Sequence, residues 1–319
     1  DDPRYKKLRT QTKIYGVWDD HDSGQNNADL SNPYKDQVRQ IFLDYIGEPK
    51  NSPRRTRKGG MYESYYLDAD KRIKLILLDG RYSREPSKTS RSKYSPHRST
   101  LGAEQEEWLL KELESSEAVF TIVGLGMQLF CEERPKVETG GTKLKRLIMG
   151  ANVKSRLIVI TGDVHLAEIM REPCYEEKMG VSLVEITSSG LAHSIHDKMG
   201  DLAEHYLYFQ DAETSNTNAE RYIKVNYGIM DFHIDRKNPE NSEARAYLKD
   251  IDGRVIMAAR IQALQSSTKR GSNEAMLKCM DDRPTPFNRF WKHVTTAGPR
   301  FLKNGLPTRM PYHVNPRLE

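Results

Sequence analysis

The chain has 319 residues, of which 30% are charged and 37% hydrophobic, and its formal net charge is +5. This length is enough for one large domain or two ordinary ones with a sizeable buried core. No apolar run approaches the ~18 residues that a membrane-spanning helix needs, so the sequence predicts no transmembrane segment. Its three cysteines, Cys131, Cys174 and Cys279, are odd in number and widely spaced, which predicts buried or free thiols rather than a disulfide framework.

The positive charge is concentrated near the C-terminus. From residue 266 onward ten Lys and Arg stand against four acidic residues, whereas the rest of the chain is close to neutral. The same segment contains several prolines and no sustained apolar period. We therefore expect a folded domain over residues 1–265 and a basic appendage over residues 266–319, whose charge would suit an anionic partner.

A short apolar stretch, residues 13–18, is the first predicted strand, and the run Asp19-Asp20-His21-Asp22 follows it directly. Three clustered carboxylates repel one another unless a cation or bound protons compensate them. A hard metal ion is the simplest compensation. The alternative is a solvated turn in which an Asp caps a helix.

An amphipathic helix is predicted next, because Val38, Ile41, Phe42, Tyr45 and Ile46 recur at helical spacing and are expected to pack in the core. Gly47 is expected to end it. A basic loop over residues 53–60 then leads to two paired strands, 61–67 and 72–78. Residues 81–100 lack periodicity and are long for a connection, which indicates either disorder or an active-site loop.

The remaining elements alternate between helices and strands and then become a run of strands. Helices are expected at 101–113 and 143–149, and strands at 119–123, 156–161, 181–187, 227–235, 244–248 and 255–264. The last three are expected to pair antiparallel. This order predicts an α/β fold, a layered α/β/β/α sandwich of two mixed sheets flanked by helices, rather than a Rossmann sheet.

A second polar cluster, Gly162-Asp163-Val164-His165, follows the clearest buried-strand pattern in the chain, residues 156–161. Alternate residues after a strand can project the same way, so Asp163 and His165 would offer an oxygen and a nitrogen to one point. Such a pair suits Zn, Mn or Fe better than Ca alone. The alternative interpretation is that this segment is a surface loop without a ligand. The presence of two such clusters at predicted strand ends favours a metal site.

Several motifs in order make the sequence resemble the alkaline-phosphatase-D-type (PhoD-like) family of metallophosphoesterases over about residues 1–235. The motifs are Trp18-Asp19-Asp20-His21-Asp22 with Gly24 and Asn26, Leu78-Asp79-Gly80-Arg81-Tyr82, Leu101-Gly102 with Gln105 and Trp108, Thr161 to Glu168, and Thr187 to Leu191 with His193 and Ser194. The resemblance implies a two-sheet α/β sandwich, a dinuclear metal centre and hydrolysis of phosphate esters, either mono- or diesters.

Site roles follow from the resemblance residue by residue. Asp20, Asp163 and His165 match metal ligands, and the cofactors implied are two divalent or trivalent ions such as Fe, Zn, Mn or Ca. His21 matches the histidine that faces the scissile ester, where its imidazole suits the proton donor. Asp22 is assigned to catalysis beside it.

Three further residues are candidates for substrate binding. A guanidinium at Arg81 would hold a phosphate by paired hydrogen bonds, or it would form a salt bridge with Asp79 or another acid. Asn26 would position a substrate oxygen, although an Asn in a turn needs no such role. His193 lies within a matched motif, whereas His196 does not and is expected to be structural.

The sequence departs from the family pattern in three places. Asn27 occupies a position where the family has Asp. Gly80 occupies a position where Thr is commoner in the family. Nothing matches the Gly-Asp-x-x-Tyr motif whose acid bridges the two metals, so the domain is expected to be N-terminally incomplete and to bind at most one ion firmly. The alternative function is a catalytically silent phosphatase-fold protein that binds a partner through its basic loop and tail.

Overall fold

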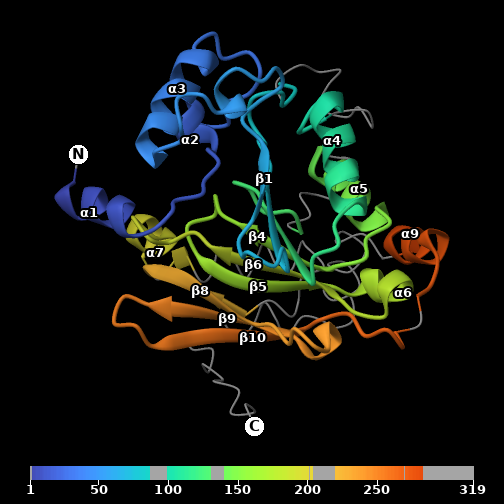
Figure 1. Cartoon of the computed structure of the whole chain (residues 1–319). Coiled ribbons are helices and arrows are strands. Elements are labelled where there is room, and N and C mark those ends of the chain that lie inside the picture. Colours follow the sequence, from blue (N-terminus) through green and yellow to red (C-terminus); the bar gives the residue numbers. More distant parts are fainter. Residues whose placement is uncertain are drawn as a thin grey trace, which may run out of the picture.

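The computed structural model describes residues 2–86, 99–130, 140–200, 202–203, 220–268 and 270–282. Two β-sheets stack on each other (Figure 1). The larger has seven strands in the order β1-β2-β3-β4-β6-β5-β7 and the smaller has three in the order β10-β9-β8. Their bounds are β1 Glu63–Tyr66, β2 Ile73–Leu77, β3 Phe120–Gly124, β4 Arg156–Thr161, β5 Ala167–Glu172, β6 Leu183–Ser188, β7 Glu220–Tyr222, β8 Asn226–His233, β9 Glu243–Asp250 and β10 Val255–Gln262.

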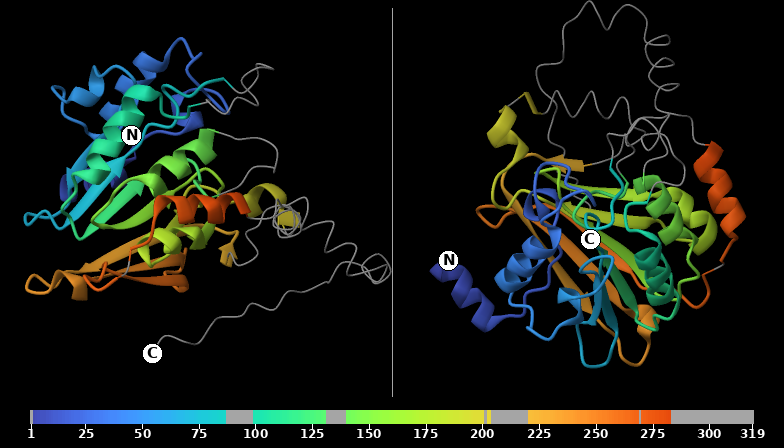
Figure 2. Two further views of the ribbon diagram at one scale, coloured as in Figure 1. Left: turned by 90° about the vertical axis from the view of Figure 1, so that its right-hand side faces the viewer. Right: turned by 90° about the horizontal axis from the view of Figure 1, so that it is seen from above.

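Helices cover the face of the larger sheet that is turned away from the smaller one (Figure 2). On this face lie α4 (Ala103–Glu114), α5 (Gly140–Gly150), α6 (Glu176–Met179) and α9 (Asn273–Asp282). The other described helices are α1 (Pro3–Gln11), α2 (Asp20–Ser23), α3 (Lys35–Ile46), α7 (Ile195–Met199) and the 3-10 turns Pro53–Arg55, Pro173–Tyr175 and Pro239–Asn241. No described helix is long and apolar enough to cross a bilayer.

The central strands are apolar on both faces because each face is covered. In β4, Leu157 and Val159 belong to the core under the helices, and Ile158 between them packs against the smaller sheet. This alternation is what a buried parallel strand requires. The predicted layered α/β sandwich is confirmed, although the smaller sheet is antiparallel rather than mixed.

Strands β2, β3, β4 and β6 run parallel, so their carboxyl ends meet at one edge of the larger sheet. The loops after these ends carry Asp79, Gly126, Asp163 and Ser189. Ligands of open α/β sheets bind at this edge, because the loops and not the strands are free to vary there.

The predicted amphipathic helix is α3, and Gly47 ends it in the left-handed conformation with φ 80°. Its apolar stripe was only partly interpreted correctly. The buried face consists of Arg39, Leu43 and Ile46, whereas Ile41 and Tyr45 are 69% and 57% exposed. The sequence pattern predicted the helix correctly, but it wrongly included Ile41 and Tyr45 in the buried face.

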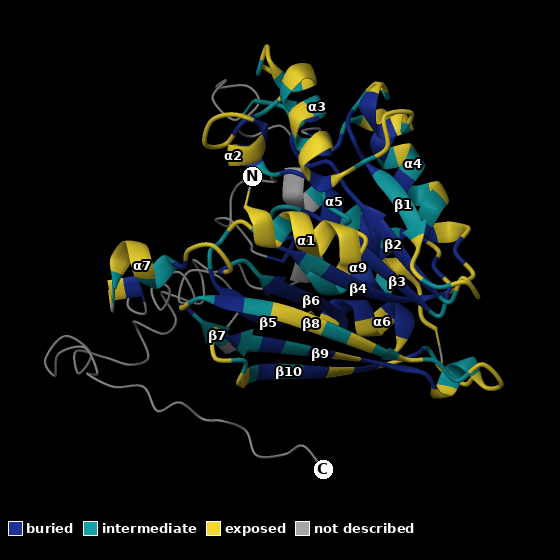
Figure 3. Ribbon diagram, turned by 60° about the vertical axis from the view of Figure 1, so that its left-hand side comes forward, coloured by how far each residue is buried: buried dark blue, intermediate teal, exposed yellow. Residues whose placement is uncertain are grey.

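The strand predicted over residues 13–18 is wrong. This segment has no regular secondary structure and joins no ladder with a described strand. The carbonyl of Gly16 instead accepts a hydrogen bond from Arg54 Nη2 at 2.6 Å, and Trp18 inserts into a small core with Leu43 and Met61. Side-chain anchoring therefore replaces sheet pairing. Helix α1, which precedes it, buries none of its residues (Figure 3).

Helix α9 corrects two expectations about the C-terminal region. Cys279 of this helix forms a disulfide with Cys174, 105 residues away in sequence, although free or buried thiols were expected. Met276 is fully buried in the core under the helices. Residues 273–282 are thus packed on the body rather than being an appendage. The predicted tail beyond residue 282, with its anionic partner, lies outside the described residues.

The disulfide predicts a stability effect. Because it closes a long loop, Cys279→Ser should lower the free energy of unfolding by about 2–5 kcal/mol. Thermal unfolding followed by circular dichroism with and without a reductant measures this: the reductant should lower the melting temperature of the wild type and leave that of Cys279→Ser unchanged. Equal melting temperatures for all four samples would contradict the pairing.

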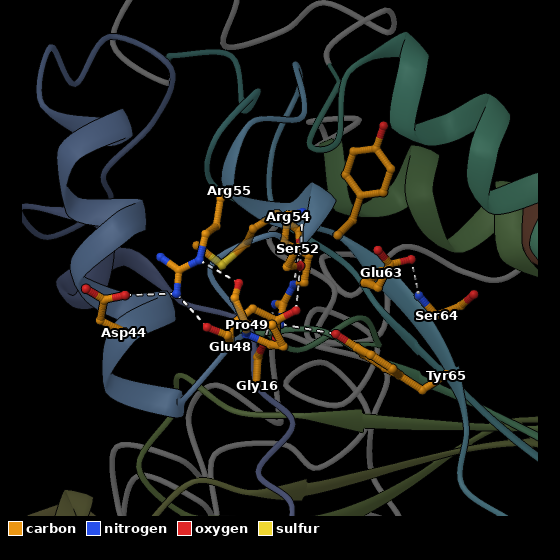
Figure 4. Close-up of polar contacts among 12 residues, drawn as sticks. Gly16, Asp44, Glu48, Pro49, Ser52, Arg54, Arg55, Glu63, Ser64 and Tyr65 are labelled. Carbon is orange, nitrogen blue, oxygen red and sulfur yellow. Dashed lines mark hydrogen bonds and ion pairs between the residues drawn. The ribbon is translucent and has the colours of Figure 1, made fainter.

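Two arginines of the basic loop over residues 53–60 bind carboxylates and carbonyl groups of the protein itself (Figure 4). Arg54 is 0% exposed and binds the carboxylate of Glu48 at 3.0 Å and two backbone carbonyls. Arg55 is 6% exposed and pairs with Asp44 at 2.8 Å. These guanidinium groups are already occupied in holding α3 and the N-terminal segment, so they are not available to a partner in the way the binding-protein alternative requires.

Candidate functional site

Three carboxylates meet at the sheet edge defined above. One oxygen each from Asp19, Asp20 and Asp163 lies within 4.8 Å of the other two. They form part of a cavity of 460 Å³. The residues that line it are Asp19, Asp20, His21, Asp22, Asp163, His165, Ser189, His193 and Lys198. The two sequence clusters that were predicted to converge therefore do so.

The first cluster is fixed through the residue before it. The buried indole of Trp18 donates from Nε1 to Asp79 Oδ1 at 2.7 Å. The carboxylate of Asp79 also accepts the backbone N–H groups of Met61, Arg81 and Tyr82 at 2.9, 3.0 and 2.9 Å. A buried carboxylate with four donors is fully satisfied. Asp79 thus ties the end of β2 to the segment that carries Asp19 and Asp20.

Asp19 is oriented by a buried arginine. Arg81 Nε donates to Asp19 Oδ1 at 2.5 Å, so the salt bridge weighed for Arg81 forms, with Asp19 rather than Asp79 as its partner. The backbone of Gly126 approaches the same carboxylate so closely that an added Cβ would lie 2.6 Å from Asp19 Oδ1. Burial raises the pKa of Asp19, and the ion pair with Arg81 opposes that shift.

Asp20 is held in its ionised form by backbone donors. Its two oxygens accept the N–H groups of His21 at 2.7 Å and Asn27 at 2.9 Å. Burial by itself would raise the pKa of Asp20, but these donors and the charge of Arg81 outweigh it and keep the pKa below its usual range. Asn27, with φ 58°, is one of the residue types that tolerate this left-handed conformation.

The second cluster lies on a tight turn between β4 and β5. Asp163 and His165 have φ values of 74° and 59°, in the left-handed region that non-glycine residues rarely adopt. The carboxylate of Asp163 accepts no hydrogen bond from the described residues, and burial together with the charge of Asp19 raises its pKa. An uncommon backbone conformation and a carboxylate without a donor among the described residues are typical of a ligand site.

His165 lines the cavity but lies outside the three-carboxylate cluster. Its ring meets that of His193 edge to face, with centroids 4.1 Å apart, and its Nδ1 is buried without a partner. Burial and then the positive charge of Lys198 lower the pKa of His165. The structure thus gives His165 an unused nitrogen beside the site.

A buried polar network centred on Glu185 adjoins the turn between β4 and β5. Glu185 of β6 accepts the N–H groups of Leu129 and Phe130, both at 2.7 Å, and the hydroxyl of Thr161 at 2.8 Å. Burial raises the pKa of Glu185 to about 7 despite these donors. The network links the loop after β3 to the last residue of β4, directly before Gly162 and Asp163.

The other predicted site residues are placed differently. Exposed His21 and Asp22 lie in the cavity lining with His193, as expected of site residues. Asn26 and Arg81 are not among the lining residues, since Asn26 lies on the exposed loop and Arg81 is buried behind Asp19. The sequence analysis did not propose Ser189 or Lys198, and it assigned no separate role to Asp19.

The donor chemistry of the cluster fits a hard cation. Three carboxylates converge, and of these Asp163 has no donor of its own among the described residues. The guanidinium of Arg81 binds Asp19, a member of the cluster, directly. Carboxylate oxygens are the preferred ligands of hard divalent and trivalent ions. The described residues thus include a site in which an ion would relieve the mutual repulsion of the acids.

A model of the PhoD-like phosphatase family matches residues 1–242. The chain belongs to this family. The resemblance stated from the sequence motifs is therefore confirmed, over nearly the same residues. No curated protein matches the chain significantly. Among solved structures, one titled "Structure of PhoD" is 16% identical, with a TM-score of 0.43. That alignment covers 88% of this chain and 60% of the other.

Membership of the PhoD-like family supports a phosphoesterase function and hence a hydrolase. The three-carboxylate cluster is consistent with a metal ion in that function.

Proposed function

We propose that this PhoD-like chain hydrolyses phosphate esters with a metal ion held by Asp20 and Asp163, which are oriented beside Asp19. The observation that carries the proposal is the convergence of three carboxylates from two distant segments, within 4.8 Å, in a cavity that also contains three histidines. Phosphate-ester cleavage needs charge neutralisation, an activated water and a proton for the leaving alkoxide. The lining offers groups for each need.

The chemistry that a bound ion supplies at such a site is neutralisation of phosphate oxygens and acidification of a bound water. The protein's own residues do the rest. Asp20 stays ionised through its backbone donors, and Asp163 presents an unpaired carboxylate. His21, exposed beside Asp20, would donate a proton to the departing oxygen of the alcohol.

Arg81 acts through Asp19 in this proposal rather than on the substrate. Its guanidinium is buried, it pairs with Asp19, and it stands outside the cavity lining. Neutralising one of three crowded acids in this way lets the cluster assemble before an ion is present. His165 and His193 line the same cavity and would contact the ion or the phosphate.

The expected stoichiometry is one firmly bound ion per described site. Two adjacent ions need a shared carboxylate to offset their repulsion. Of the three clustered acids, Asp19 is engaged by Arg81 and the oxygens of Asp20 by two backbone donors. The binding-protein alternative relied on the basic loop and the tail, and within the described loop Arg54 and Arg55 are already paired internally.

The proposal is tested on the purified chain after chelation and reloading with Mn, Zn, Ca or Fe, one metal at a time. Bound metal is counted by mass spectrometry, and hydrolysis of p-nitrophenyl phosphate and bis(p-nitrophenyl) phosphate is followed optically. We expect one ion per chain and hydrolysis only after reloading. Asp252→Asn, in the exposed turn between β9 and β10, is the matched control and should behave like the wild type. Metal binding without hydrolysis of either ester would reject the proposed reaction.

A further inference from the structure

The cavity contains a cation that the proposed reaction does not use. Its described lining includes four aspartates and a single lysine, Lys198. The lysine comes from α7, an element separate from both segments that supply the clustered carboxylates. It is exposed, and no described carboxylate forms an ion pair with its ammonium group. Within the described part of the chain, Lys198 is thus a cation beside four acids to which it is not paired.

The position of Lys198 is set by the anchoring of its helix. The backbone N–H of Ile195 donates to the carbonyl of His165 at 2.8 Å, and that of His196 donates to Ile223 at 3.1 Å. Helix α7 is therefore attached directly to the turn that carries Asp163 and His165. The effect of the Lys198 charge on the pKa of His165, second only to burial, agrees with this proximity.

The nearest acid in sequence is committed elsewhere. Asp197 accepts the N–H and the hydroxyl of Ser194 through Oδ2, at 2.7 and 2.9 Å, in a capping box at the start of α7. These bonds lower the pKa of Asp197 and hold its carboxylate on Ser194. Lys198 consequently has a fixed helix beneath it and a side chain free to reach over the cavity.

The cavity is also larger than a phosphoryl group needs. Its 460 Å³ lies within the range of about 300–1,000 Å³ found for sites that enclose whole small molecules. Part of the alcohol would therefore occupy the cavity together with the phosphate. An ammonium group at its edge would contact that part, provided that the clustered acids are compensated by an ion.

We propose that Lys198 is a specificity residue that selects phosphate esters whose alcohol carries a second anionic group, a carboxylate or another phosphate. This inference rests on the proposed phosphoesterase function and names its substrate class. Lys is a compact point charge on a flexible stem, so it suits an anion whose distance from the scissile phosphate varies. A charge-assisted hydrogen bond of this kind is worth about a tenfold gain in affinity.

The test uses binding, so that it does not depend on turnover. Phenylphosphonate and 3-carboxyphenylphosphonate are titrated calorimetrically into the Mn-loaded chain. The wild type should bind the carboxylated compound about tenfold more tightly. Lys198→Met should abolish this preference, Lys198→Arg should retain most of it, and Lys198→Glu should reverse it. Lys237→Met, at an exposed turn of the smaller sheet, is the control and should keep the wild-type ratio.

Each other outcome rejects the assignment. Equal weakening of both compounds by Lys198→Met would mean that the ammonium group binds the phosphonate itself. Equal affinities in the wild type, or no binding of either compound, would mean that no second anion is selected. Parallel hydrolysis assays with phenyl phosphate and 3-carboxyphenyl phosphate distinguish failure of the specificity assignment from failure of the proposed function. If the carboxylated phosphonate binds more tightly but neither ester is hydrolysed, only the proposed hydrolysis is rejected.

Discussion

Asp163→Asn is expected to lower kcat/KM for p-nitrophenyl phosphate by about 10³-fold, because a metal ligand contributes several kcal/mol of transition-state stabilisation. It should also weaken metal binding in a calorimetric titration. The substitution removes a charge without forcing the backbone to move, since Asn, like Asp, tolerates the φ of 74° found at this position. A loss of activity can therefore be assigned to the missing carboxylate and not to misfolding.

The matched control for this experiment is again Asp252→Asn, whose carboxylate is exposed and contacts only Arg254 at 3.7 Å among the described residues. It should change neither metal affinity nor kcat/KM. The melting temperatures of both variants should stay close to that of the wild type. If Asp163→Asn kept its metal affinity and lost less than threefold in activity, Asp163 would not be a ligand.

His21→Ala is expected to slow the hydrolysis of alkyl phosphates by ~10²–10⁴-fold, because a poor leaving group needs the proton that a general acid supplies. Hydrolysis of p-nitrophenyl phosphate should slow much less, since p-nitrophenolate departs without protonation. The side chain of His21 is exposed and makes no hydrogen bond to a described residue, so its removal should leave the fold intact. Steady-state rates for the two ester types measure the difference.

A useful comparison is His196→Ala, in the anchored helix α7 but outside the cavity lining. It should slow both ester types by the same small factor, if at all. A similar large loss for both esters in His21→Ala would show that His21 binds the phosphate or the ion and is not the proton donor.

The fold was largely predictable where periodicity was strong. The buried strand β4, the helix α3 and the late antiparallel strands were found because apolar residues repeat at the spacing of each element. Strand β5 was missed because its sequence, Ala-Glu-Ile-Met-Arg-Glu, alternates weakly and follows a tight turn. Residues 13–18 have the composition of a strand but pair with no described strand. Hydrogen bonds made by the side chains of Arg54 and Trp18 hold this segment instead.

The site was predictable as two clusters but not as a geometry. Asp163 was placed correctly because it follows the parallel strand β4, and the ends of such strands share one edge. Asp20 follows no strand, and its segment reaches the same edge because Trp18 binds Asp79 after β2. The partnership of Asp19 with Arg81, 62 residues apart, depends on tertiary packing that leaves no pattern in the sequence. The same holds for the disulfide and for Lys198, which reaches the cavity only because α7 is hydrogen-bonded to the turn at His165.

The absence of ladder bonds in residues 13–18 bears on how the site opens. Asp163 closely follows β4, a central strand that is paired on both sides, whereas Asp19 and Asp20 follow a segment that is held by Trp18 and by Arg54. Amide hydrogens are exchanged fastest where few buried contacts oppose local opening. We therefore expect the N-terminal part of the site to open locally at a lower free energy than the sheet unfolds, which amide hydrogen exchange would measure. An ion held by both Asp20 and Asp163 would link these two parts of the site and would oppose the local opening of the N-terminal part.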